Sequence, residues 1–145
     1  MNSTIVKFGY PASLVREFDH WLVLVRPAQV TLGSLILAAK SDATAYGALP
    51  AEAFTEQGVI VAGIERALKD FVAFERINYL MLMMVDPHVH FHVLPRYEGE
   101  RSACGVTVRD AGWPKVPALG EAVTLDADQI DALAGWLRRL WPSAR

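Results

Sequence analysis

Two dense apolar runs, separated by a proline, occupy the first part of the chain. The segments WLVLVR (21–26) and LGSLILAA (32–39) are rich in the aliphatic and β-branched side chains that favour strands. Pro27 ends the first run, because a proline in a central strand removes a hydrogen bond from the ladder. We therefore expect 21–26 and 32–39 to form neighbouring strands, preceded by a short segment at SLVREF (13–18).

The spacing of apolar residues changes to a helical period after Pro50, a residue that suits the first turn of a helix. Five apolar side chains then follow at separations of 7, 3, 4 and 3 positions, which places them on one helical face: Phe54, Val61, Ile64, Leu68 and Phe71. We expect this face to pack on the sheet. The small and polar residues of SDATAYGALP (41–50) predict a loop before the helix.

A nearly continuous apolar run, INYLMLMMVD (77–86), follows the helix and predicts a buried strand that contributes to the core or to a dimer contact. Asp86 and Pro87 break this run, and DPHVHFHVLPRY (86–97) predicts a second strand, which Pro95 ends. The connection between the two strands is short, so we expect them to be antiparallel.

The sequence after Tyr97 is rich in glycine and proline, and residues 98–125 predict a loop with one short strand. A last helix follows, with Asp126 as N-cap and Gln129 as its capping-box partner. Its apolar stripe contains Ile130, Leu133, Leu137, Leu140 and Trp141. We expect an α+β class with a mainly antiparallel sheet, in a single domain (1–145) whose core spans about 13–97, with a loop and the C-terminal helix in 98–145.

Composition limits the class of protein and the kinds of binding partner that are expected. The chain has 145 residues, of which 52% are hydrophobic and 21% charged, as is typical of a globular domain with a core. Its net charge of -2 gives no basic surface, so neither nucleic acid nor an anionic membrane is an expected partner. The sequence has no apolar run of about 18 residues, as a membrane span requires, and no signal-peptide pattern. The single cysteine, Cys104, excludes an internal disulfide. The expected compartment is therefore the cytoplasm.

Three of the four histidines lie within DPHVHFHVLPRY, at every second position. Alternate side chains of a strand point to the same face, so His88, His90 and His92 share one face at spacings of about 6–7 Å. The intervening apolar side chains point the other way, towards the helix and the core: Val89, Phe91 and Val93. The segment therefore combines an apolar face for burial with an imidazole face for chemistry.

Three interpretations of the imidazole face remain open on the residues alone. In the first, the histidines are unrelated surface residues. In the second, they bind a metal such as zinc or copper, and in the third they surround a phosphate. Three successive positions on one straight strand converge poorly on a tetrahedral ion, and Asp86 is the only acidic neighbour in the segment. Imidazole, with an ordinary pKa of about 6.5, can act as nucleophile, proton donor or cation near neutral pH, which suits phosphoryl chemistry.

The motif HVHFHVL followed by PR resembles the signature of the histidine triad (HIT) family of nucleotide hydrolases and transferases. The resemblance extends from about Trp21 to Tyr97, where VTLGSLILAAK (30–40) resembles the family's second strand and ALPAEAF (48–54) the start of its central helix. It implies a HIT-like fold, with a mainly antiparallel sheet of about five strands, a central helix and a C-terminal helix. It also implies a homodimer and a nucleotide or nucleotide-like substrate.

By the same resemblance, His90 is the nucleophile, which attacks the α-phosphorus of a nucleoside phosphate anhydride, ester or phosphoramidate. A covalent nucleotidyl-histidine forms and is then hydrolysed. A main-chain carbonyl near His88 holds the proton on the other ring nitrogen of His90, His92 lies by the leaving-group oxygen or a non-bridging oxygen, and His88 buttresses the arrangement. The reaction requires no cofactor and no structural metal, although magnesium can accompany a polyphosphate substrate.

Departures from the family pattern indicate further candidates for substrate binding. Ser34 stands where the family commonly has a fourth histidine, and Arg26 where it often has the Asp or Asn that holds the ribose. Arg26 could bind a phosphate or form a salt bridge at the end of its strand. Asp86, in a shortened loop before the triad, could orient a histidine, bind a substrate hydroxyl or simply form a turn.

Two residues beyond the histidines complete the candidates. Arg96 could gather an anionic substrate, and Trp113, in RDAGWP (109–114), could lie over the site as a stacking or lid residue. A solvated surface charge and ordinary packing are the respective structural alternatives. The departures also leave two alternatives to an enzyme, which are a nucleotide-binding or regulatory module with little turnover and a histidine metal-binding protein.

Overall fold

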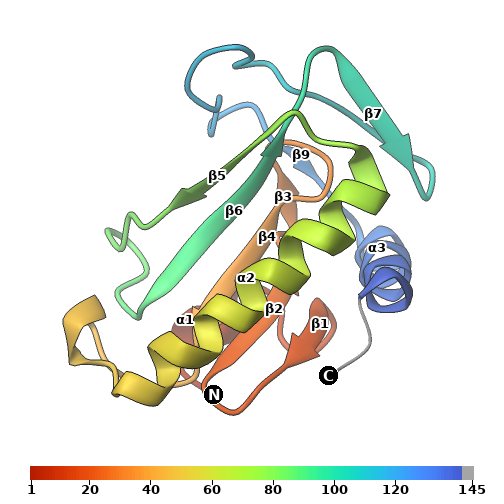
Figure 1. Ribbon diagram of the computed structural model, residues 1–145. Helices are drawn as coiled ribbons and strands as arrows, with labels where there is room; N and C mark the ends of the chain where they lie inside the picture. The colour runs from red at the N-terminus through yellow and green to blue at the C-terminus, as the bar shows by residue number, and fades with distance from the viewer. Residues whose placement is uncertain (142–145) are drawn as a thin grey trace.

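A five-stranded antiparallel sheet in the order β1-β2-β4-β6-β5 forms the centre of the protein, as Figure 1 shows. The computed structural model describes residues 1–141. The strands of this sheet are β1 (Leu14–Glu17), β2 (Trp21–Val25), β4 (Leu35–Ala39), β5 (Arg76–Leu80) and β6 (His90–Arg96). The predicted α+β class is confirmed, and so is the pairing of the first two apolar runs, because β2 and β4 are antiparallel neighbours.

The long helix α2 (Ala51–Val72) covers one face of the sheet (Figure 1). Alternate residues of β2 and β4 point towards this helix, so Val23 and Leu37 meet Ile64 and Leu68 in the main apolar core. Val89 and Val93, which alternate with the histidines, belong to the same core, and Phe91 packs against it, as predicted.

The predicted apolar stripe of α2 is wrong at its first position. Phe54 is exposed, and the neighbouring Ala53 is the buried residue of this turn. The Trp21 indole donates a hydrogen bond to the Ala53 carbonyl at 2.7 Å, which fixes this side of the helix against the sheet. Phe54 packs instead on Tyr46, with ring centres 5.2 Å apart.

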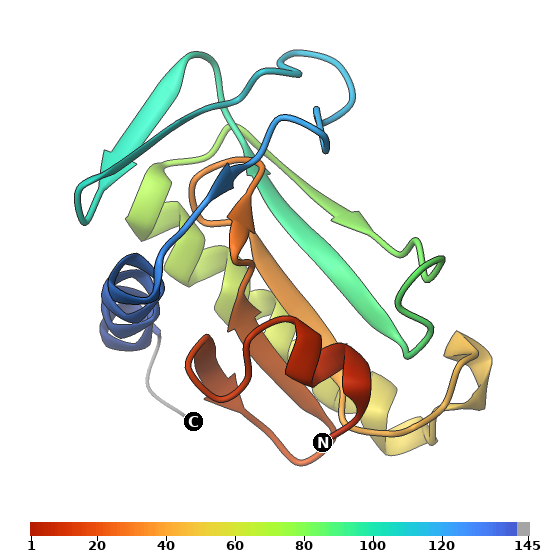
Figure 2. The same cartoon turned by 180° about the vertical axis from the view of Figure 1, so that it is seen from behind.

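A short helix, α1 (Ser3–Lys7), lies against the opposite face of the sheet, as Figure 2 shows. Asn2 caps this helix, since its side chain accepts a hydrogen bond from the Ile5 amide at 3.0 Å. Ile5 and Phe8 complete a second apolar cluster with residues of β2 and β4, among them Leu24 and Ile36. Sequence patterns do not predict α1, because five residues are too few to show a helical period. Ile5 and Phe8 are both buried.

The strand after α2 is shorter and less buried than predicted. β5 ends at Leu80 and lies at an edge of the sheet, with β6 as its neighbour. Leu82, Met84 and Val85, expected in the same buried strand, are exposed in the connection to β6. An edge strand has a partner on one side only, so an apolar run does not by itself decide burial. The prediction that β5 and β6 are antiparallel is confirmed.

The prediction that Pro95 ends the histidine strand is also wrong. β6 continues to Arg96, with Pro95 opposite Ile77 of β5. The pairing of β6 with β4 stops where Val93 faces Leu35. Beyond Val93 the strand has β5 as its one neighbour in this sheet and is locally an edge, a position in which a proline is tolerated.

The chain after β6 contains more regular structure than the single short strand predicted for it. The remaining strands are β3 (Ala28–Gln29), β7 (Glu100–Ala103), β8 (Val106–Arg109) and β9 (Val123–Thr124). β7 and β8 form a hairpin, whereas β9 pairs with β3, which precedes β4 in the chain. This hairpin lies beyond the end of the main sheet in both views (Figures 1 and 2).

The last helix, α3 (Ala127–Leu140), packs beside β1 and α2. Its predicted capping box is confirmed, because the Asp126 side chain accepts from the Gln129 amide at 2.8 Å and the Gln129 side chain accepts from the Asp126 amide at 2.9 Å. Leu133 and Leu137, from the predicted stripe, are buried. A single turn of 3-10 helix, η1 (Tyr46–Ala48), precedes α2.

Arg96, at the end of β6, forms a buried ion pair with Asp110. Its Nε and Nη2 donate to the two carboxylate oxygens at 2.7 and 3.1 Å, and Arg96 is only 3% exposed. Further hydrogen bonds reach the Asn78 side chain and the Lys115 carbonyl, both at 2.8 Å. Arg96 therefore ties β5 and the segment after β8 to β6, and it is not free to gather substrate as the sequence hypothesis allowed.

We expect Arg96→Ala to lower the free energy of unfolding by about 3 kcal/mol, because Asp110 would stay buried without its cation. Urea denaturation measures this loss. Arg66→Ala is the matched control, since Arg66 is exposed on α2, and we expect it to change stability by less than about 0.5 kcal/mol. Equal stability of the two variants would contradict the structural role of Arg96.

Candidate active site

The last two histidines of the motif project from β6 on the face of the sheet that α1 covers. His90 begins the strand opposite Ala38, and His92 lies opposite Ile36. Their ring centres are 5.1 Å apart. His88 precedes β6, so the predicted common face of one strand holds for His90 and His92, whereas His88 approaches them from the connection.

A main-chain hydrogen bond fixes the tautomer of His90. Nδ1 of His90 lies 2.7 Å from the carbonyl oxygen of His88. A carbonyl oxygen can only accept a hydrogen bond, so Nδ1 carries the proton and donates it. Nε2 of a neutral His90 therefore holds an unshared electron pair, which is the form that a nucleophile requires.

The tautomer of His92 is the opposite one, and Arg26 sets it. The Arg26 Nε–H group donates to Nδ1 of His92 at 3.2 Å. A guanidinium can only donate, so Nδ1 of His92 carries no proton and Nε2 carries the single proton of the neutral ring. Burial, followed by the positive charges of Arg26 and His90, lowers the pKa of His92 to about 4, although Asp86 opposes the change. At pH 7 the ring is therefore a neutral hydrogen-bond donor.

We expect the lowered pKa of His92 to make the fold less stable in mild acid. The unfolded chain binds this proton near the ordinary value of 6.5, whereas the folded chain binds it near 4. Between these values the unfolded state holds more protons, so the contribution of His92 to stability is present above pH 6.5 and is lost as the pH falls to 4. Urea denaturation at several pH values tests this: His92→Asn should flatten the dependence, and an unchanged dependence would contradict it.

Helix α1 closes over the two imidazoles. The Phe8 ring centre lies 5.6 Å from that of His90 and 5.9 Å from that of His92, and the Thr4 hydroxyl lies 2.9 Å from Nδ1 of His88. His90 is only 1% exposed and His92 only 7%. Nδ1 of His90 is bonded to the His88 carbonyl, and no side chain or backbone group of residues 1–141 forms a hydrogen bond with Nε2 of His90.

Two of the other sequence candidates lie at this site. Arg26 joins it through His92, and a second bond, from Nη1 to the Ala28 carbonyl at 2.5 Å, fixes its guanidinium. Asp86 lies at its edge, where its carboxylate pairs with Lys7 of α1 at 2.7 Å. The loop before the triad is therefore tied to the helix that covers the triad.

The remaining candidates are not brought to the histidines. Ser34 is fully buried, and its hydroxyl donates to the Thr31 carbonyl at 2.7 Å, so it closes a local turn and is not available to a substrate. Arg96 is held by Asp110. Trp113 lines a separate pocket, which lies between β5 and the segment 113–117.

The sequence hypotheses missed the residues that α1 brings to the site, Thr4, Lys7 and Phe8. The one signal that could have indicated a helix there is Asn2, a favourable N-cap residue. Within residues 1–141, no group of three or more His, Cys, Asp or Glu side chains is arranged to hold a metal ion. No helix in this part of the chain is long and apolar enough to cross a membrane.

Comparison with known proteins gives matches among solved structures only. No family model matches the sequence, and no curated protein matches it. A histidine triad protein from Bradyrhizobium japonicum superposes with a TM-score of 0.73 at 20% identity, over 97% of this chain and 96% of that one. A diadenosine triphosphate hydrolase from Plasmodium falciparum gives 0.67 at 10% identity, over 89% and 76%. A zinc-bound histidine triad family protein from Mycobacterium smegmatis gives 0.58 at 18% identity, over 94% and 91%.

These likenesses define the class of the fold. The similar solved structures are consistently histidine triad proteins, and they cover most of the chain. The protein therefore has the HIT-like fold that the resemblance of the HVHFHVL motif implied, with a five-stranded antiparallel sheet, a central helix and a C-terminal helix. At these identities the likeness concerns the fold, and the chemistry must be argued from the side chains.

Proposed function

We propose that the protein hydrolyses nucleoside phosphates through a covalent nucleotidyl intermediate on His90. The observation that carries this proposal is the hydrogen bond from Nδ1 of His90 to the His88 carbonyl, which directs the electron pair of Nε2 away from the backbone. The HIT-like fold supports it, as does the likeness to a protein described as a diadenosine triphosphate hydrolase. The Thr4 hydroxyl contacts Nδ1 of His88, and His88 in turn stabilises the start of β6, which carries His90.

The reaction has two displacements at the α-phosphorus. Nε2 of His90 attacks, a P–N bond forms, and the bond from phosphorus to the leaving group breaks, with its electron pair going to the leaving group. Nδ1 keeps its proton, so the nucleotidylated ring is a cation, which the His88 carbonyl stabilises. Water then attacks the same phosphorus, the P–N bond breaks, neutral His90 is restored, and a proton is released with the nucleoside monophosphate.

The protonation state of His92 favours the cleavage of one bond type over the others among phosphoric anhydrides, esters and phosphoramidates. Its neutral ring donates a hydrogen bond from Nε2 but transfers that proton poorly, because Arg26 already occupies Nδ1. Leaving groups that depart as anions, such as nucleoside diphosphates, need no proton. Amines and alkoxides do need one, so the site favours phosphoric anhydrides. Arg26 adds positive charge beside the displaced oxygens.

Access to Nε2 requires a movement of α1, because His90 is almost completely buried beneath Phe8. Near-complete burial is also the observation that favours the second candidate, a nucleotide-binding or regulatory module with little turnover. Incubation with diadenosine polyphosphates and with adenosine phosphoramidates separates the two. We expect release of AMP from the anhydrides, whereas nucleotide binding without any product would support the binding module.

We further propose that the protein acts as a homodimer on a nucleotide-like substrate. The exposed apolar side chains of Leu82, Met84 and Val85, beside the edge strand β5, supply a surface for self-association. Analytical ultracentrifugation tests the dimer, and a monomer at all concentrations would contradict it. Magnesium with a polyphosphate substrate and a cytoplasmic location stay predictions.

A further inference from the structure

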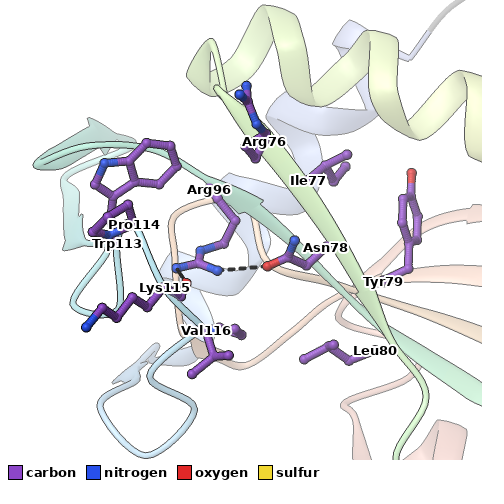
Figure 3. A pocket seen from close by; sticks show the side chains of 11 residues that line it. Arg76, Ile77, Asn78, Tyr79, Leu80, Arg96, Trp113, Pro114, Lys115 and Val116 are labelled. Atoms are coloured by element: carbon purple, nitrogen blue, oxygen red, sulfur yellow. Dashed lines mark hydrogen bonds between the residues drawn. The ribbon is translucent and has the colours of Figure 1, made fainter.

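A cavity separate from the histidines lies on the sheet face that carries them. It has a volume of about 550 Å³ and lies between β5 and the segment 113–117. Figure 3 shows Trp113 and Lys115 on one side, Arg76 and Leu80 on the other, and Arg96 between them. The segment 113–117 falls outside the part of the chain that resembles the HIT family in sequence.

Strand register connects this pocket to the histidines. Leu80 lies opposite His92, and Arg76 lies opposite Arg96. Alternate residues share a face, so the row from Leu80 to Arg76 runs along the same side of the sheet as the row from His92 to Arg96. Four residues of strand span about 13 Å, so the pocket extends about that far from the position opposite His92, the neighbour of His90 on this face, and a polyphosphate bound at His90 can reach into it.

The lining combines an aromatic surface with unneutralised positive charge. Trp113 is half-buried, with part of its indole open to the cavity. Arg76 and Lys115 are exposed, and neither forms an ion pair with a carboxylate of residues 1–141. Indole surfaces stack on nucleobases, and such cations bind phosphates. The pocket therefore suits a planar base joined to an anionic group.

The pocket is preformed because Arg96 holds both of its walls. The guanidinium donates to Asn78 of β5 and to the Lys115 carbonyl, both at 2.8 Å, while Asp110 neutralises its charge. The dashed bond to Asn78 is visible in Figure 3. A binding surface that is fixed before the ligand arrives loses less freedom on binding.

We propose that this pocket is the subsite for the leaving nucleotide, in which Trp113 stacks on its base and Arg76 and Lys115 bind its phosphates. This inference rests on the proposed hydrolase function, and it makes Trp113 a specificity-determining residue for substrates with a second nucleoside. When Nε2 of His90 displaces the leaving nucleotide, the P–O electron pair departs with a group that is already held as an anion.

Two substrates that transfer the same adenylyl group test the assignment. Diadenosine triphosphate leaves ADP, whereas ATP leaves pyrophosphate, which has no base to stack. We expect Trp113→Ala to lower kcat/KM about tenfold for diadenosine triphosphate, to leave ATP unchanged, and to be largely rescued by Trp113→Phe. Trp136→Ala, which removes an exposed tryptophan of α3, is the control and should alter neither substrate. Equal effects of Trp113→Ala on both substrates, or none, would overturn the subsite.

A binding measurement keeps this test separate from that of the hydrolase itself. If the wild-type protein turns over neither substrate, the proposed function has failed, and calorimetric titration with ADP then examines the pocket alone. Weaker ADP binding in Trp113→Ala and Lys115→Ala supports a nucleotide pocket. Unchanged ADP binding in both variants overturns the nucleotide pocket. If a variant loses ADP binding but keeps the wild-type ratio of kcat/KM for diadenosine triphosphate to kcat/KM for ATP, the assignment of the pocket to the leaving group is overturned.

Discussion

Substitution of His90 by asparagine should abolish turnover of nucleoside phosphate anhydrides, lowering kcat by on the order of 10⁴-fold or more. The reason is that asparagine has no basic nitrogen to attack phosphorus, while its side chain is small enough to fit the space beneath Phe8. Steady-state release of AMP from diadenosine triphosphate measures the effect.

The control for His90→Asn is His20→Asn. His20 lies between β1 and β2, outside the motif, and is the only other histidine in the chain. We expect this variant to keep wild-type kcat. Both variants should show wild-type circular dichroism, so that loss of fold does not imitate loss of the nucleophile. A His90→Asn protein that retains more than about a tenth of the wild-type kcat would exclude His90 as the nucleophile.

Removal of the Arg26 side chain is the second change for which we expect a large effect. Arg26→Ala should reduce kcat/KM by about 10²-fold, because the developing negative charge loses a cation and His92 loses the bond that sets its tautomer. The same change should raise the pKa of His92 from about 4 towards its ordinary value, since one of the charges that lower it is gone.

The two effects of Arg26 are measured separately, the first by steady-state kinetics and the second by NMR titration of the His92 ring. Arg26→Lys is a useful comparison, because it keeps a positive charge but lacks the Nε–H group that binds His92. We expect it to recover part of the rate. If Arg26→Ala left both the His92 pKa and kcat/KM unchanged, the proposed positioning of His92 by Arg26 would be wrong.

Features that depend on local sequence were predictable. The paired strands around Pro27, the capping box of Asp126 and Gln129, and the shared face of His90 and His92 each follow from the period or chemistry of a few adjacent residues. The HVHFHVL motif, read as a resemblance, also led to the fold class, which the solved structures bear out.

Features that depend on distant partners were not predictable. Arg26 and His92 are 66 positions apart, and they meet because β2 and β6 pair with opposite edges of β4 and the long Arg26 side chain reaches across that strand. Arg96 looked like a free cation, since nothing near it in sequence reveals that Asp110 would fold back against it. α1 is held by burial of Ile5 and Phe8 and not by helical propensity, so its position over the histidines emerged only from the packing.

The most direct test of the central claim is to trap the covalent intermediate on His90. Wild-type protein mixed rapidly with diadenosine triphosphate, quenched in base because the P–N bond is labile in acid, and digested with trypsin should give a peptide from Ile77 to Arg96 that carries one adenylyl group. Fragmentation in the mass spectrometer should place that group on His90, and the adduct should be absent from His90→Asn. Steady turnover with no adduct, or an adduct on another residue, would contradict the account.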